Sequence, residues 1–108
     1  NTPEEEAELC LSILVALNAT FYDNGRKQQF IQHLLDRCWN VLDKLPASLL
    51  KVRLLTCCYG EVYDEKLASE AHSIIDTWDT SSLTPEQTEI IGELKNMEEN
   101  QYPFEIVD

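Results

Sequence analysis

The chain has 108 residues and a formal charge of −12, from 20 acidic and 8 basic side chains. A chain of this length predicts one domain. The low content of Lys and Arg excludes nucleic acid and anionic membrane surfaces as partners, since both require basic side chains. The charge is compatible with a basic protein partner. No apolar run approaches the ~18 residues of a membrane-spanning helix.

The negative charge is concentrated at the two ends of the chain. Residues 1–8 contain four glutamates and no basic residue, and residues 84–108 contain seven acidic residues and one lysine. Residues 9–83 are nearly balanced, with nine acidic and seven basic residues. Two interpretations are open: the acidic ends keep the domain soluble, or they bind a basic client protein.

The spacing of apolar residues predicts an all-α fold. Their 3.6-residue period recurs in five segments, and the loops between them are short. Short loops favour antiparallel neighbours, so we expect an array of α-hairpins similar to a bundle or an α-solenoid. The predicted helices cover about 3–21, 26–45, 49–59, 64–78 and 85–99.

Two of these helices begin with the same signal. In the first, Thr2 suits the N-cap, Pro3 suits the first helical position, and Glu5 closes a capping box. The segment 84–87, Thr-Pro-Glu-Gln, repeats this pattern at the start of the last helix. Both starts are therefore predicted from local contacts alone.

The segment 49–59 is predicted to be the central helix. Its apolar residues surround the helix axis and are interrupted only by Lys51, Arg53 and Thr56. A helix that is apolar on nearly all sides is buried on several sides. Gly60 either caps this helix or lies inside a slightly longer one that reaches Tyr63. The second half of the first helix is also apolar on most faces, so we expect it to be well covered.

We expect residues 1–99 to form a single helical domain and residues 100–108 to form an extended tail. Pro103 excludes helix in this tail, where apolar and acidic residues alternate. The chain begins with Asn1 rather than Met, which suggests a processed or excised piece.

No catalytic or metal-binding motif is present in the sequence. His33 and His72 lie in predicted helices, and Asp76 follows His72 by one turn as a local partner. Neither histidine has the spacing of a metal site or of a nucleophile–base pair. We therefore predict a protein that is not an enzyme and that binds no cofactor and no metal.

The chain has four cysteines. None forms a C-x-x-C pair, and adjacent cysteines bridge only with strain. We predict reduced core thiols of a cytoplasmic protein. The cysteines are Cys10, Cys38, Cys57 and Cys58.

Six residues are candidates for binding a partner protein. Two are basic residues at the start of the second helix, where positive charge is unfavourable for the helix dipole. Two are tryptophans, a residue type that is enriched at interfaces and also at the edges of cores. Two are aromatic residues of the tail. In this order, the candidates are Arg26, Lys27, Trp39, Trp78, Tyr102 and Phe104.

Three segments of the sequence resemble a known family. Residues 8–15, 29–35 and 47–55 resemble successive helices in the N-terminal helical-repeat region of PCI-domain complex subunits, such as the m subunit of eukaryotic translation initiation factor 3. The resemblance covers about residues 5–78 and consists of helix-pattern residues. It implies a noncatalytic protein–protein interaction module, a scaffold subunit of a multi-subunit cytosolic assembly with a role in translation. The alternative is an acidic binding chaperone or adaptor for a basic client protein.

Overall fold

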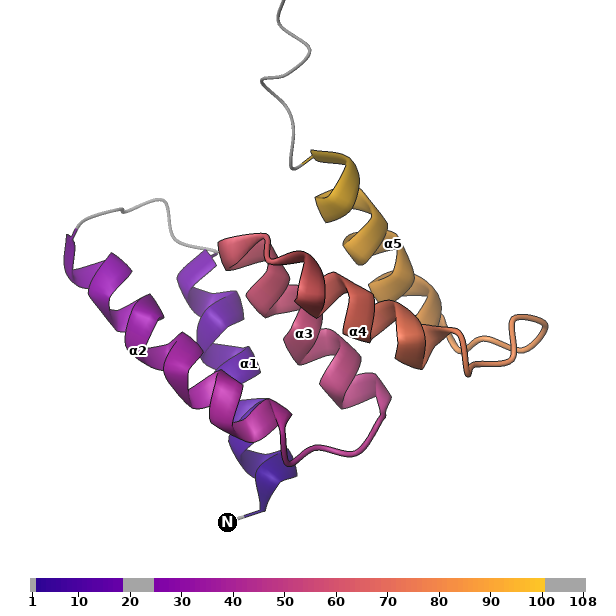
Figure 1. Ribbon diagram of the computed structural model, residues 1–108, viewed down its shortest axis with the longest axis horizontal. Coiled ribbons are helices and arrows are strands. Elements are labelled where there is room, and N and C mark those ends of the chain that lie inside the picture. Colours follow the sequence, from indigo (N-terminus) through magenta and orange to yellow (C-terminus); the bar gives the residue numbers. More distant parts are fainter. Residues whose placement is uncertain (1, 19–24, 101–108) are drawn as a thin grey trace, which may run out of the picture.

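The computed structural model describes residues 2–18 and 25–100, and the described residues form five helices and no strand (Figure 1). This confirms the predicted all-α fold. Residues 101–108, which include nearly all of the predicted tail, and the predicted end of the first helix near Phe21 lie outside the described residues. None of the described helices is long and apolar enough to cross a membrane. The helices are α1 (Pro3–Asn18), α2 (Gly25–Leu42), α3 (Leu49–Val62), α4 (Glu65–Ile75) and α5 (Pro85–Asn100).

Helix α3 is the central helix, as its sequence predicts. It packs against each of the other four helices, with α1 and α2 on one flank and α4 and α5 on the other (Figure 1). Its polar Thr56 is buried without an unpaired group, because the hydroxyl donates a 2.7 Å hydrogen bond to the Val52 carbonyl oxygen one turn earlier. The buried side chains of α3 are Val52, Leu54, Leu55, Thr56, Cys58 and Tyr59.

Both ends of α3 are fixed by local contacts. Ser48 is the N-cap, and its hydroxyl accepts a 3.2 Å hydrogen bond from the Lys51 amide. At the other end Tyr63 adopts the left-handed conformation, with φ of 53°, and its amide donates to the Tyr59 carbonyl. Gly60 therefore lies inside α3 and does not cap it, which is the second of the two alternatives that the sequence left open. A Cβ atom there would be 3.2 Å from the Met97 sulfur, so this glycine allows α5 to approach α3 closely.

The two predicted capping boxes are both present. The Glu5 amide donates to the Thr2 hydroxyl at 3.1 Å, and the Thr2 amide donates back to the Glu5 carboxylate at 3.0 Å. At the start of α5, the Gln87 amide donates to the Thr84 hydroxyl at 3.1 Å, and the Thr84 amide donates to the Gln87 side-chain oxygen at 2.9 Å. Residues within one turn of each other determine both helix starts.

Two helices end earlier than predicted. Helix α2 ends at Leu42 rather than Leu45, and the next residues form a turn before Pro46, which disfavours helix in the residue that precedes it. Helix α4 ends at Ile75 rather than Trp78. There the Trp78 amide donates to the Ile75 carbonyl, a tighter i to i−3 bond that is common where a helix ends.

The core has two parts that share α3. On one side, fully buried residues of α1 and α2 pack against it, among them Leu14 and Cys38. On the other side, α4 contributes Ala71 and α5 contributes Leu94, both fully buried. A 2.7 Å ion pair also joins Lys51 of α3 to Glu70 of α4.

We expect Leu54→Ala to lower the free energy of unfolding by about 2–5 kcal/mol, because truncating a fully buried leucine leaves a cavity. Urea unfolding followed by circular dichroism measures this change. The matched control is Leu9→Ala on α1, where the side chain is half exposed and the cost is below about 1 kcal/mol. Equal stability of the two variants would contradict the central position of α3.

Candidate functional site

The two tryptophans predicted to bind a partner lie in different environments. Trp39 is on α2, and 37% of its surface is exposed. Trp78 follows the end of α4 and is partly buried against the core. The exposed position of Trp39 suits a contact with another protein, whereas Trp78 contributes to packing. A partner-binding role of either residue stays a prediction.

Of the other four predicted residues, the structure describes only the backbone of Arg26 and Lys27. These two are in the first turn of α2, about 20 Å along the helix axis from Trp39. Their side chains lie outside the described part of the chain, as do Tyr102 and Phe104. A partner-binding role of these four residues stays a prediction.

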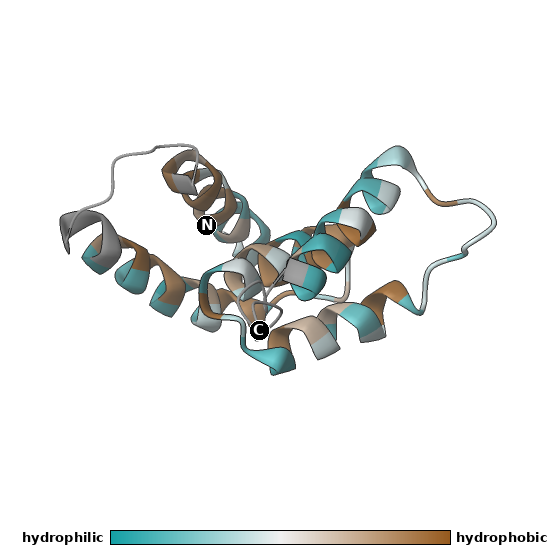
Figure 2. Cartoon of the chain, turned by 90° about the horizontal axis from the view of Figure 1, so that it is seen from above, coloured by the Kyte–Doolittle hydropathy of each residue, from teal (hydrophilic) through white to brown (hydrophobic). Residues whose placement is uncertain are grey.

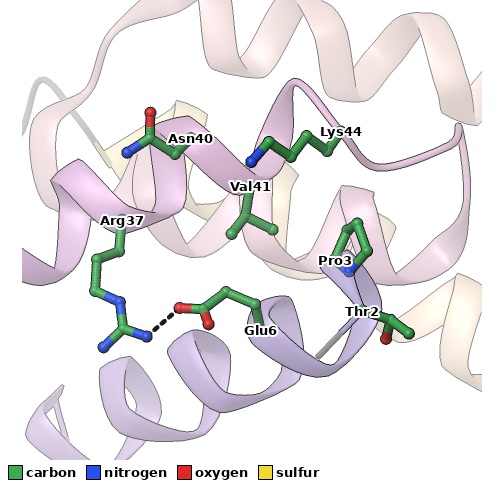
Figure 3. Close-up of a pocket in the computed structure, with 7 residues that line it drawn as sticks. All are labelled: Thr2, Pro3, Glu6, Arg37, Asn40, Val41 and Lys44. Carbon is green, nitrogen blue, oxygen red and sulfur yellow. Dashed lines mark hydrogen bonds and ion pairs between the residues drawn. The ribbon is translucent and has the colours of Figure 1, made fainter.

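A shallow cleft of about 290 Å³ lies between the start of α1 and the last two turns of α2 (Figure 3). Its apolar lining comes from Pro3 and Val41. The Glu6 carboxylate and the Arg37 guanidinium form an ion pair across it, and the Lys44 side chain lies at the far end (Figure 3). Because 55% of the Arg37 side chain is exposed, this pair adds at most about 1 kcal/mol to stability. The cleft therefore offers a mixed apolar and charged surface for a partner and is open to solvent rather than enclosed.

Several large apolar side chains are exposed that the sequence did not reveal. Leu9 and Val15 of α1 are 50% and 55% exposed, and Phe30 of α2 is 49% exposed. The expectation that the second half of α1 is well covered is therefore wrong at Val15. Apolar residues surround α1, and the helices that pack against it decide which of them are buried. The amphipathic pattern alone does not contain that information.

Three thiols meet where α1, α2 and α3 pack together. Cys10, Cys38 and Cys58 are each fully buried, and Cys38 contacts the sulfur of each of the other two. Burial raises the pKa of Cys10 to about 12, and the neighbouring Cys38 adds to the shift. The contact with Cys58, followed by burial, raises the pKa of Cys38 well above its ordinary value. These cysteines are free core thiols, as predicted.

Cys57 differs from the other three cysteines because it is only partly buried. Burial raises the pKa of its thiol to about 11, and the carboxylates of Glu93 and Glu61 contribute next. A thiol with this pKa is almost fully protonated near neutral pH and is a poor nucleophile. Cys57 therefore offers no reactive thiolate near neutral pH.

The histidines have no catalytic surroundings within the described residues. His72 does not pair with Asp76. Its Nε2 atom lies 3.0 Å from the Glu98 carboxylate of α5, 26 residues further along the chain. No group of three His, Cys, Asp or Glu side chains in residues 2–18 and 25–100 could hold a metal ion.

The fold and surface define a small, acidic, all-α protein with charged and apolar side chains exposed on its helices. The family profile of the UpxZ family of transcription anti-terminator antagonists matches residues 1–60. The crystal structure of the transcription anti-terminator antagonist UpxZ from Bacteroides uniformis is 58% identical to this chain, with a TM-score of 0.93. That match covers 100% of this chain and 70% of the Bacteroides uniformis chain. The chain belongs to the UpxZ family. No curated protein matches it.

These matches overturn the resemblance to PCI-domain subunits. The segments that carried it, 8–15, 29–35 and 47–55, contain the apolar residues with which α1, α2 and α3 pack together. Any set of packed helices requires such patterns, so they do not identify a family. The prediction of a helical-repeat scaffold in a translation-related assembly is therefore wrong. The UpxZ family consists of transcription anti-terminator antagonists, a regulatory class.

We expect the free energy of unfolding to fall as the pH rises above about 9, the ordinary pKa of a cysteine thiol. Above that pH the unfolded chain loses the Cys10 proton, while the folded chain keeps it until about pH 12. The slope from one such thiol reaches about 1.4 kcal/mol per pH unit. Urea unfolding at several pH values from neutral to alkaline measures it.

Cys10→Ala is the control for this pH dependence. Removing the thiol makes the alkaline slope shallower, because the contribution of Cys10 is lost while Cys38 and Cys57, whose pKa values are also raised, still contribute. An identical slope in the two proteins would show that Cys10 ionises equally in the folded and unfolded chains.

Proposed function

We propose that this chain antagonises a bacterial transcription anti-terminator by binding to it directly in the cytoplasm, where bacterial transcription takes place. The observation that carries the proposal is the match of the whole chain to UpxZ of Bacteroides uniformis at 58% identity and a TM-score of 0.93. At this identity and TM-score the arrangement of the helices is shared, so a shared mode of action is the simplest account.

The charge of the chain supports a protein as the target. With a net charge of −12, a direct contact with DNA or RNA phosphates is repulsive. A protein that works on a transcribing complex meets nucleic acid and needs basic surface to do so. An acidic antagonist that covers such a surface competes with nucleic acid for the same charges. Stoichiometric binding of this kind needs no catalytic residue.

In vitro transcription through a terminator tests the proposal. The probe is a purified anti-terminator that is inhibited by UpxZ of Bacteroides uniformis. We expect added chain to lower terminator read-through until the chain equals the anti-terminator in concentration. The control reaction lacks the anti-terminator, and there we expect no change in termination. Unchanged read-through at a large excess of chain would contradict the proposal, and inhibition at far less than one equivalent would contradict stoichiometric binding.

A further inference from the structure

A groove runs along one side of α3, between α1 and α5. It consists of two adjoining hollows of about 240 and 440 Å³, which share the side chains of Leu11, Val15 and Arg53. We call it the α1–α3–α5 groove and define it by Leu11 and Val15 of α1, Arg53 and Cys57 of α3, and Glu89 and Glu93 of α5.

The arrangement of the helices creates this groove. Figure 2 shows α1 and α5 on the same side of the molecule, diverging from each other, with α2 and α4 on the opposite side. Both α1 and α5 pack against α3, which forms the floor between them. A further helix that packs against α3 in this groove would lie with its axis about 8–10 Å from that of α3.

The wall formed by α1 is apolar at Leu11 and Val15, and Glu8 and Ser12 lie beside them at one end of the groove. Val15 is 55% exposed, and Leu11 is partly buried against the core. They are four residues apart and so lie one turn apart on one face of α1. Exposed apolar side chains beside a concave surface are typical of an interaction site, because covering them removes apolar area from water.

The opposite wall, formed by α5, is acidic. Glu89 and Glu93 are both exposed and are spaced i and i+4, so two like charges face the same side of the helix. Such a pair is unfavourable for an isolated helix. Glu61 of α3 adds a third carboxylate close by, because it and Glu93 both act on the Cys57 thiol. Arg53 lies on the floor of the same hollow, and it forms no salt bridge with any residue that the structure describes.

The groove is as long as about two turns of an α-helix. Its lining extends from Leu50 to Cys57 on α3, and from Glu8 to Val15 on α1. Seven residues of helix span about 10 Å, which is two turns. Two turns of a partner helix present apolar side chains at i, i+3 or i+4, and i+7, the pattern by which helices bind in grooves.

We propose that the α1–α3–α5 groove binds an amphipathic helix of the anti-terminator. The apolar face of that helix covers Leu11 and Val15, and its Lys or Arg side chains pair with Glu89 and Glu93. This inference rests on the proposed function and assigns the surface that performs it. A second copy of this chain is the poorer occupant, because it brings a net charge of −12 to an acidic groove.

Two groove variants test the assignment, each with a matched control. Val15→Arg places a charge on the apolar wall, and Leu9→Arg places the same charge at a similarly exposed position elsewhere on α1. The double variant Glu89→Lys with Glu93→Lys reverses the acidic wall. Its control, Asp36→Lys with Asp43→Lys, changes the net charge equally at two exposed positions, one inside α2 and one just after its end. Circular dichroism checks that each variant is folded.

The measurement is the Kd for the purified anti-terminator of the transcription assay, by isothermal titration calorimetry at low and high salt. We expect both groove variants to weaken binding by about tenfold or more, and both controls to stay within about twofold of the original chain. We also expect the charge-reversed groove variant to lose most of the salt dependence.

The outcomes separate the two proposals. If the original chain binds and inhibits the anti-terminator but the groove variants bind as tightly as the controls do, the groove assignment is wrong and the proposed function stands. If the original chain neither binds nor inhibits, the proposed function fails. A dimer of the original chain that Val15→Arg dissociates would show a second copy in the groove and would overturn the assignment.

Discussion

The packing of α3 between two pairs of helices is the constraint on which the rest of the structure depends. This helix contacts α1, α2, α4 and α5, and its side chains supply the shared centre of both halves of the core. The helix ends support this position. Ser48 fixes where α3 begins, and the left-handed Tyr63 turns the chain so that α4 returns along α3. On one flank α4 and α5 are held chiefly by packing against α3, and on the other flank α1 and α2 pack against each other as well as against α3.

The same constraint accounts for the exposed surface. Both α1 and α5 pack against α3, and they diverge from each other (Figure 2). One face of each helix therefore lines the groove. On α1 that face is apolar and includes Val15, and on α5 it carries Glu89 and Glu93. Neither feature helps the isolated fold, since exposed apolar area and adjacent like charges are both unfavourable in water. Both are favourable against a partner that is apolar on one side and basic on the other, which connects the fold to the proposed antagonism.

Much of this fold follows from local sequence signals. The capping boxes at Thr2 and Thr84 involve residues within one turn, and the apolar circumference of 49–59 requires burial on several sides. The candidate site was not predictable in this way, because Val15 is exposed only through the separation of α1 from α5. His72 shows the same limit, since its observed partner Glu98 is 26 residues away, whereas Asp76 is near in sequence. The mistaken family resemblance has a related cause, because core-facing apolar periods are common to unrelated helical proteins.

Amide hydrogen exchange of the chain, with and without the anti-terminator, tests the central claim most directly. Bound partner slows exchange where it covers helices and prevents their local opening. We expect added protection in residues 8–15, 50–57 and 89–93, with little change in α2. Protection centred on α2 and the cleft at Arg37, with the groove unchanged, would contradict the claim that the anti-terminator binds between α1 and α5.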